Sequence, residues 1–258
     1  MTTSGDTRLT PVAGFYDALA PDYDLMTGAM KRLNVETAVL SDLVRDFGIA
    51  KAIDAGCGTG LHTCILAQLG VEVIGVDVSA EMLVHASARA REMKVNVRFC
   101  RSAFAEMDME GTAVVDGVFC LGNSLTHLLT SSDVTQSLRS FFRALKSEGL
   151  LFLQILNYQR ILSQKNRVQN VREEGGRLFI RFYDFEHELI RFNILALEKG
   201  TGGFLHRLHS VELNPLRAAE LDRSLSDTGF REIRMFGNIK RDPFGPDSSS
   251  DLFVIARK

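Results

Sequence analysis

The chain has 258 residues, of which 45% are hydrophobic and 24% charged, and its formal net charge is −2. This length suits one α/β domain with an insertion, and the composition is that of an ordinary soluble globular protein. Lys and Arg are dispersed, no apolar run is long enough to span a bilayer and no signal peptide is visible, so we expect a cytoplasmic protein without a nucleic-acid or membrane partner.

The first fifty residues predict a helical cap. An apolar pattern between residues 8 and 48 favours helices that precede the sheet, and we assign residues 1–50 to this cap. From residue 51 onward, short apolar runs alternate with helical periodicity, which is typical of βα units and a parallel sheet. The expected strands are 51–56, 71–78, 95–100, 114–121 and 149–156, and the expected helices are 59–70, 79–93 and 132–146.

The βα rhythm stops after residue 160. Residues 167–213 are rich in Phe, Ile and Leu and contain glycine pairs at 175–176 and 202–203, which predicts antiparallel strands joined by turns. A helix over 214–230, with Pro215 near its first turn and Gly229 at its end, and strands at 231–237 and 251–258 would close the fold. We therefore divide the chain into a cofactor-binding core (51–160), an insertion over the active site (161–213) and a closing segment (214–258).

The four cysteines do not form a recognisable metal or disulfide pattern. No C-x-x-C pair is present and all four stand in apolar segments, so we expect buried thiols in a reducing compartment. These cysteines are Cys57, Cys64, Cys100 and Cys120.

A glycine-rich turn, "IDAGCGTGLH" at 53–62, follows the first strand of the core. Gly56 and Gly58 fit the dinucleotide fingerprint G-x-G-x-x-G, but Leu61 occupies its third glycine position and the next glycine is Gly60. Three alternating glycines exceed what a plain strand-to-helix turn needs. The turn is therefore expected to hold a nucleotide other than a dinucleotide.

Two acidic residues flank this turn and narrow the ligand. Asp54 stands at its entrance, where it would repel a pyrophosphate and attract an ammonium group, although it could also cap the following helix. Asp77 ends the next strand, where a carboxylate accepts hydrogen bonds from two ribose hydroxyls. Capping is the alternative role for Asp77, but Ser79 already provides it. The pattern suits a nucleoside joined to an amino acid, such as S-adenosylmethionine.

At this point the sequence resembles the class I S-adenosylmethionine-dependent methyltransferases. The resemblance rests on "IDAGCGTG", "VIGVDVSAEML", "FCRSAF" and "DGVFCLGNSLTHL" in the family's order, and on a closing "DTGFREIRMFG" and "DLFVIARK", and it covers about residues 10–258. It implies an α/β fold with a doubly wound, mostly parallel, Rossmann-like sheet and a reversed last strand. The implied cofactor is S-adenosylmethionine, with S-adenosylhomocysteine as product.

The resemblance also implies which residues surround the cofactor. Phe104 would stack on adenine, whereas Met82 is equally suited to the core, and Arg32 would pair with the methionine carboxylate. Ala103 departs from the family's usual Asp, so Ser102 or a backbone carbonyl would accept from the adenine amino group. The full expected set is Tyr23, Arg32, Asp54, Gly56, Cys57, Gly58, Gly60, Asp77, Val78, Met82, Ser102, Ala103, Phe104, Cys120, Leu121 and Gly122.

The stretch after the fourth strand bears on the methyl acceptor. It lacks the proline motif of DNA and RNA amino-methyltransferases, and "LGNSLTHL" is similar to glycine and sarcosine N-methyltransferases. Chain length and the β-rich insertion also resemble aminosugar N,N-dimethyltransferases. We expect N-methylation of a small amine, with homo-oligomerisation left open. The alternatives are O- or C-methylation of a lipophilic small molecule, or a cofactor-binding protein without activity.

Three residues are predicted to act at the acceptor. If residues 124–129 begin a helix, Asn123 and His127 lie on one side of it, with His127 as the available base and Tyr16 orienting the amine. The alternative is that Asn123 is a turn residue and His127 a half-buried helix residue. Leu156 stands where the glycine-methylating relatives carry an arginine for the substrate carboxylate. This favours an amine without a free carboxylate, unless Arg160 or an arginine of the insertion replaces the missing one.

Overall fold

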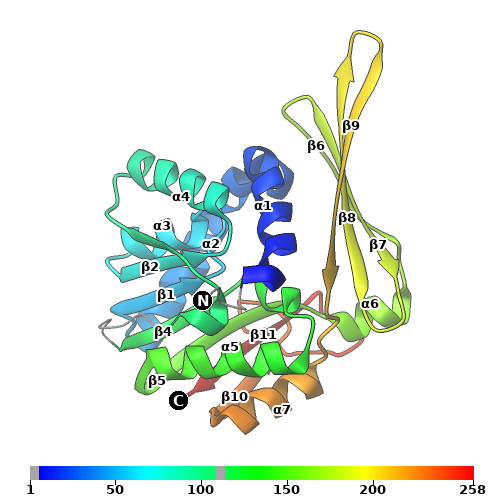
Figure 1. Cartoon of the computed structure of the whole chain (residues 1–258). Coiled ribbons are helices and arrows are strands. Elements are labelled where there is room, and N and C mark those ends of the chain that lie inside the picture. Colours follow the sequence, from blue (N-terminus) through cyan, green and yellow to red (C-terminus); the bar gives the residue numbers. More distant parts are fainter. Residues whose placement is uncertain (1–5, 108–113) are drawn as a thin grey trace.

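A seven-stranded sheet forms the body of the protein, in a computed structural model that describes residues 6–107 and 114–258. Its order is β10-β11-β5-β4-β1-β2-β3, and β11 runs antiparallel to both of its neighbours while the other pairs are parallel. The predicted doubly wound sheet with a reversed last strand is confirmed (Figure 1). The strands are β1 (Lys51–Ala55), β2 (Glu72–Asp77), β3 (Arg98–Arg101), β4 (Val115–Cys120), β5 (Leu145–Leu156), β10 (Arg231–Phe236) and β11 (Asp251–Arg257).

The helices begin and end largely where the sequence indicates. Ser79 caps α4 as predicted, because its Oγ accepts a hydrogen bond from the Met82 N–H at 3.1 Å, and Gly229 ends α7 in the left-handed conformation. Pro215, predicted near the first turn of α7, precedes that helix, which begins only after Arg217. The helices are α1 (Asp6–Thr27), α2 (Ala29–Phe47), α3 (Leu61–Gln68), α4 (Ala80–Glu92), α5 (Ser131–Ala144), α6 (Tyr158–Gln164) and α7 (Ala218–Thr228), with 3₁₀ turns at η1 (Phe104–Glu106) and η2 (Ser124–His127).

Apolar side chains pack against both faces of the sheet in two clusters. One cluster joins the sheet to α2 and α3 and includes Phe119 and Phe152, whose rings stack at 4.5 Å. The other cluster joins it to α1, α5, α7 and the second sheet. Burying both faces is what a parallel sheet with helical crossovers requires. Three of the four cysteines are buried, as expected, whereas Cys100 is only half-buried.

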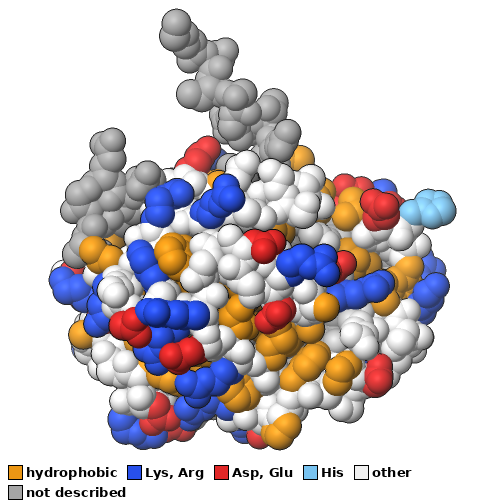
Figure 2. All heavy atoms as spheres, turned by 90° about the horizontal axis from the view of Figure 1, so that it is seen from below, with side chains coloured by type: hydrophobic (Ala, Val, Ile, Leu, Met, Phe, Trp, Pro, Cys, Tyr) orange, Lys and Arg blue, Asp and Glu red, His pale blue; other side chains and the backbone are white. Residues whose placement is uncertain are grey.

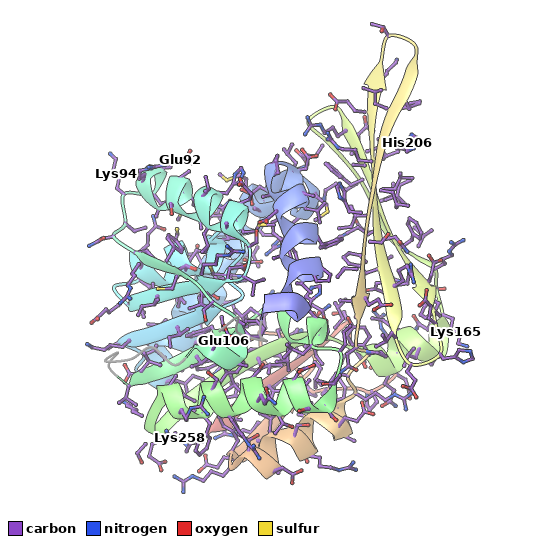
Figure 3. All side chains as sticks on the ribbon, in the orientation of Figure 1. Glu92, Lys94, Glu106, Lys165, His206 and Lys258 are labelled. Carbon is purple, nitrogen blue, oxygen red and sulfur yellow. The ribbon has the colours of Figure 1, made fainter. Side chains whose placement is uncertain are left out.

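The second sheet is the predicted antiparallel insertion. Its order is β6-β7-β8-β9, and the glycine pairs lie at its turns, with Gly175 and Gly176 both at positive φ. The predicted boundary at residue 161 falls inside α6, so the insertion's strands start later, at residue 168. The strands are β6 (Val168–Glu174), β7 (Arg177–Phe185), β8 (Ile190–Gly200) and β9 (Gly203–Leu213). The far end of the β8–β9 ribbon projects beyond the rest of the molecule, and His206 lies lower on the same ribbon (Figure 3).

Helix α1 lies between the two sheets (Figure 1) and forms polar contacts with residues of both sides. On one side, the Asp17 carboxylate accepts from Ser79 Oγ at 2.5 Å, just past the carboxyl end of β2. On the other side, the buried Asp22 forms ion pairs with Arg177 and Arg207 of the second sheet. Pro21 stands inside this helix between the two anchors. Helix α1 therefore lies over the carboxyl edge of the main sheet, whereas α2 packs on one face of that sheet.

The face of the molecule seen from below carries both positive and negative side chains. Lys and Arg side chains are interspersed there with Asp and Glu (Figure 2). None of the helices within the described ranges is both long and apolar enough to pass through a membrane.

Candidate functional site

The three glycines of the turn after β1 have different surroundings. All three have positive φ, at 76°, 54° and 78° for Gly56, Gly58 and Gly60. A Cβ on Gly56 would lie 2.7 Å from Ser124 Oγ, and one on Gly60 would lie 2.8 Å from Ala86 Cβ. A Cβ on Gly58 would meet nothing closer than a Tyr23 ring carbon at 3.9 Å. Gly56 and Gly60 therefore serve close packing of the chain, whereas the space at Gly58 is open for a ligand.

Asp77 lies beside this open space. Its two carboxylate oxygens accept from the Gly58 N–H at 2.8 Å and from the Ser79 N–H at 2.9 Å. A carboxylate has about four lone-pair positions, so each oxygen can still accept another hydrogen bond. Burial raises the pKa of Asp77. Two remaining acceptor positions are what a ribose with two adjacent hydroxyls would use.

Asp54 is wholly buried and bonds to the helix that follows the turn. The Thr63 hydroxyl of α3 donates to Asp54 Oδ2 at 2.5 Å, and burial raises the pKa of the Asp54 carboxyl. This contact ties the Asp54 carboxylate to the side chain of Thr63 in the first turn of α3. The role of Asp54 toward an ammonium group of the ligand stays a prediction.

The predicted adenine residues follow β3. Ala103 is buried, the Ser102 hydroxyl donates to the carbonyl of Ala103 at 3.1 Å, and the Phe104 ring lies 5.4 Å from that of Phe141. Met82 has no exposed surface and lies on the buried face of α4. Stacking of Phe104 on adenine stays a prediction, and Ser102 keeps its hydroxyl oxygen free to accept.

The other predicted cofactor residues lie along the same edge. Cys57, Cys120 and Leu121 are buried. Gly122 has a positive φ and its N–H donates to the Gln154 side chain at 3.3 Å, and the Val78 carbonyl accepts from Arg101 Nε. Backbone groups dominate this part of the edge.

Arg32 lies at the beginning of α2 in a small charged cluster that the sequence did not reveal. Its Nε donates to Glu36 at 2.6 Å, and the other Glu36 oxygen lies 2.8 Å from His62 Nε2. Burial alone would raise the pKa of Glu36, but the hydrogen bonds and charges of His62 and Arg32 hold it at about 2. Because Glu36 engages only Nε, the two Nη groups of Arg32 remain for a ligand carboxylate.

Tyr16 and His127 form a direct pair. Tyr16 Oη and His127 Nε2 are 2.7 Å apart, and their rings meet edge to face at 5.2 Å. Burial lowers the pKa of His127 to about 4, while His127 Nδ1 is buried without a partner within the described residues. His127 is therefore neutral at pH 7 and fixes the position of the Tyr16 hydroxyl.

Asn123 has protein partners at both ends of its amide. Its Nδ2 donates to the Tyr158 hydroxyl at 2.8 Å, and its Oδ1 accepts from the Leu156 N–H at 3.0 Å. The predicted helix after it is only one 3₁₀ turn, because Asn123 adopts the left-handed conformation and Leu128 is extended. The α-helical spacing argument for Asn123 and His127 is therefore wrong. Asn123 positions Tyr158, which is buried and close to Tyr16 electrostatically.

All four tyrosines of the chain are linked around this edge. The rings of Tyr16 and Tyr23 meet edge to face at 6.1 Å, and Tyr158 lies near enough to Tyr16 and to Tyr183 of β7 to raise the pKa of each, in addition to the larger effect of burial. Arg181, two residues from Tyr183, closes the ring because it interacts with both Tyr23 and Tyr183. The sequence analysis assigned no site role to Tyr183 or Arg181. The chain has only four tyrosines, and this scarcity could have drawn attention to Tyr183.

Neither a metal-binding cluster nor the best-defined surface hollow coincides with the predicted site within the described residues. No group of three or more His, Cys, Asp or Glu side chains in the part of the chain that the structure describes is arranged to hold a metal ion. A surface hollow of about 510 Å³ between α2 and residues 239–241 shares no residue with the predicted site.

Acid should destabilise the protein through His127. The unfolded chain takes up a proton below about pH 6.5, whereas the half-buried His127 resists protonation until about pH 4. The free energy of unfolding should therefore fall by about 2 kcal/mol from this group between pH 7.5 and 5. Urea unfolding of wild type and His127→Gln at both pH values measures it, and the variant should lose less stability by that amount. Equal losses in the two proteins would contradict the burial of a neutral His127.

Known proteins that are similar to this chain are methyltransferases. A family model described as a methyltransferase domain matches residues 52–149. The glycine/sarcosine N-methyltransferase of Halorhodospira halochloris is 30% identical over 215 residues, which are 82% of this chain and 76% of that protein. The glycine/sarcosine N-methyltransferase of Parasynechococcus marenigrum is 29% identical over 80% of this chain and 71% of that protein.

A solved structure agrees over nearly the whole chain. The S-adenosylmethionine-dependent methyltransferase from Clostridium acetobutylicum aligns with a TM-score of 0.78 over 94% of this chain and 98% of that one, at 15% identity. At that identity the likeness concerns the fold.

Proposed function

This chain belongs to the class I S-adenosylmethionine-dependent methyltransferases, and from that premise we propose that it methylates the nitrogen of a small amine. The cofactor and the reaction class are those of the family. The choice of nitrogen is supported by the half-buried pair of Tyr16 and His127 and by the N-methyltransferase names of the relatives.

The residues at the edge of the sheet fit S-adenosylmethionine. No protein atom lies within 3.9 Å of the position that a Cβ on Gly58 would take, which leaves room for the cofactor, and Asp77 keeps two acceptor positions for the ribose. Arg32 retains its Nη groups for the methionine carboxylate. When bound there, S-adenosylmethionine supplies an electrophilic methyl group on a positively charged sulfur.

The hydrogen bond between Tyr16 Oη and His127 Nε2 is the observation that carries the choice of nitrogen, because it occupies the ring nitrogen that a general base would use. A hydroxyl acceptor must lose its proton to become a good nucleophile, and a base with a pKa of about 4 takes that proton poorly. An amine in its neutral form needs no base, because its lone pair already attacks and its extra proton leaves after transfer. A neutral histidine also avoids placing a second positive charge beside a sulfonium.

The tyrosines supply what an amine needs. The Tyr16 hydroxyl is held by His127 and is thereby fixed in direction, whereas the hydroxyl of the buried Tyr158 is already engaged by Asn123 at 2.8 Å and by Thr126 at 3.5 Å. Fixed hydroxyl oxygens can accept the N–H groups of an amine and aim its lone pair, which is the main task in a displacement that depends on alignment. The apolar bodies of the rings exclude water from the same space.

The proposal is tested with a panel of acceptors at equal concentration. Glycine, sarcosine, aminosugars and other carboxylate-free amines are compared with phenols and catechols, and released S-adenosylhomocysteine and product mass are measured. We expect transfer to an amine, and kcat/KM should rise about tenfold per pH unit until the pKa of that amine is reached. The pH profile should move when a less basic amine replaces the first. Transfer only to oxygen or carbon acceptors would establish the alternative activity, and cofactor binding without any transfer would support a non-catalytic protein.

A further inference from the structure

Arg181 points to the inner face of the second sheet. In β7 the buried residues Phe179 and Tyr183 alternate with Arg181 between them, so all three share one face. Arg177 also lies on this face, and it pairs with Asp22 of α1. The face therefore looks toward α1 and the main sheet, and side chains fill this space (Figure 3).

Arg181 differs from the neighbouring arginines in having no carboxylate partner. Arg32 pairs with Glu36, and Arg172 of β6 lies 3.6 Å from Glu174. For the half-buried Arg181, no hydrogen bond or ion pair to any described residue is found. Burial lowers its pKa, and the nearby Arg172 and Arg32 add to that effect while Tyr183 and Tyr23 oppose it. A charge that is partly desolvated without a counter-ion is costly, which points to a ligand that completes it.

A second unsatisfied group lies directly beside Arg181. Asn170 of β6 is the register partner of Arg181, so the two side chains are on the same face of the sheet. Asn170 Oδ1 is buried and has no hydrogen-bond partner within the described residues. The arginine and the amide thus form an incomplete polar pair that faces the four tyrosines.

We propose that Arg181 binds a carboxylate of the methyl acceptor, with Asn170 as its polar neighbour. This assignment rests on the proposed N-methylation and narrows the substrate to an amine that carries a carboxylate. It reverses the expectation drawn from Leu156, because the guanidinium that is missing at the end of β5 is supplied from the insertion. A guanidinium matches a carboxylate with two parallel hydrogen bonds, which a single ammonium or hydroxyl group does not.

The position of Arg181 indicates where the carboxylate and the amine of such an acceptor would lie. Arg181 shares its face of β7 with Tyr183 and lies near enough to Tyr23 for the two to shift its pKa, and the Tyr23 ring is 6.1 Å from that of Tyr16, which bonds to His127. A carboxylate at Arg181 would leave the amine of the same molecule among the tyrosine hydroxyls. A Tyr23 ring carbon also lies 3.9 Å from the Cβ position of Gly58, whose N–H donates to Asp77, so the amine would lie on the side of the cofactor.

Binding measurements test the proposal without requiring turnover. The full-length protein, saturated with S-adenosylhomocysteine, is titrated calorimetrically with glycine and with glycinamide, which has the same amine but no carboxylate. Wild type should bind glycine more tightly. Arg181→Gln should weaken glycine binding by about 10- to 100-fold and leave glycinamide binding within about twofold, since only the charge-assisted pair is lost. Arg181→Lys should recover part of the loss.

Arg191→Gln is the matched control, because this exposed arginine of β8 has its own partner, Glu186, at 2.9 Å. It should bind both amines as wild type does. Equal affinity of wild type for glycine and glycinamide, or an unchanged preference in Arg181→Gln, would overturn the proposal.

A carboxylate could also come from the methionine part of the cofactor, and a further titration separates the sources. Arg181→Gln should bind S-adenosylhomocysteine and 5′-methylthioadenosine, which lacks the amino-acid part, as wild type does. Selective weakening of S-adenosylhomocysteine would assign Arg181 to the cofactor and overturn the acceptor assignment. Failure of the proposed function gives a different result, namely methyl transfer to oxygen acceptors while the glycine preference in binding still depends on Arg181.

Discussion

Gly56→Ala should destabilise the fold by about 2–5 kcal/mol and abolish cofactor binding. A φ of 76° costs a residue with a Cβ about 1–2 kcal/mol, and overpacking adds about 1–3 kcal/mol. The new methyl group would lie 2.7 Å from Ser124 Oγ and 3.2 Å from Phe104 Cζ, so the turn cannot keep its place against η1 and η2. Urea unfolding measures the loss of stability, and calorimetry with S-adenosylhomocysteine measures binding.

Gly58→Ala is the control that separates folding from binding. Gly58 also has a positive φ, but its Cβ would have no neighbour closer than 3.9 Å. We expect a loss of only about 1–2 kcal/mol in stability, from the backbone alone, together with at least tenfold weaker cofactor binding. Normal cofactor affinity in Gly58→Ala would show that the open space at this glycine is not where the ligand approaches.

Asp77→Ala should weaken S-adenosylhomocysteine binding by about 2–4 kcal/mol, or roughly 30- to 1000-fold in Kd. The expected loss comes from two charge-assisted hydrogen bonds to the ribose, reduced by imperfect additivity. Titration calorimetry below the unfolding transition gives the affinity, and a parallel titration with NAD examines the dinucleotide alternative. Unchanged affinity, or binding of NAD instead, would refute the assignment of Asp77.

Asp116→Ala provides a matched control for this substitution. Asp116 also uses its carboxylate to accept from two backbone N–H groups, those of Ala50 at 2.8 Å and Lys51 at 2.7 Å, but it lies at the beginning of β4, opposite the cofactor edge. Its removal should lower stability without changing cofactor affinity. A comparable loss of affinity in both variants would mean that Asp77 acts only through the fold.

The parts of the site that local sequence determines were predictable. The glycine turn, Asp77 and the Ser79 cap lie within thirty residues of one another, and each is fixed by the strand or helix that it ends or begins. The reversed β11 was predictable because the closing segment resembles the family's terminal hairpin. Such features need no knowledge of which distant segments meet.

The acceptor side was less predictable because it depends on the register of the insertion. Arg181 faces inward only because β7 pairs with β6 and β8 in one particular alignment, and a shift of one residue would turn it outward. Asn123 was misread for a local reason. Its left-handed backbone turns the chain away from an α-helix and directs its amide to Tyr158 and Leu156, and asparagine is one of the few residues that tolerates this conformation.

Helix α1 contacts both the cofactor side of the main sheet and the second sheet, so its movement would affect the release of both the cofactor product and the methylated amine. Asp17 holds it to the cofactor side and Asp22 to the second sheet, and Pro21 between them removes one helical hydrogen bond and so weakens the helix at that point. Release of the spent cofactor and release of the methylated amine would then follow from the same local opening. An amine that receives one methyl group would be free to depart before fresh cofactor arrives, so successive methylation should be distributive rather than processive.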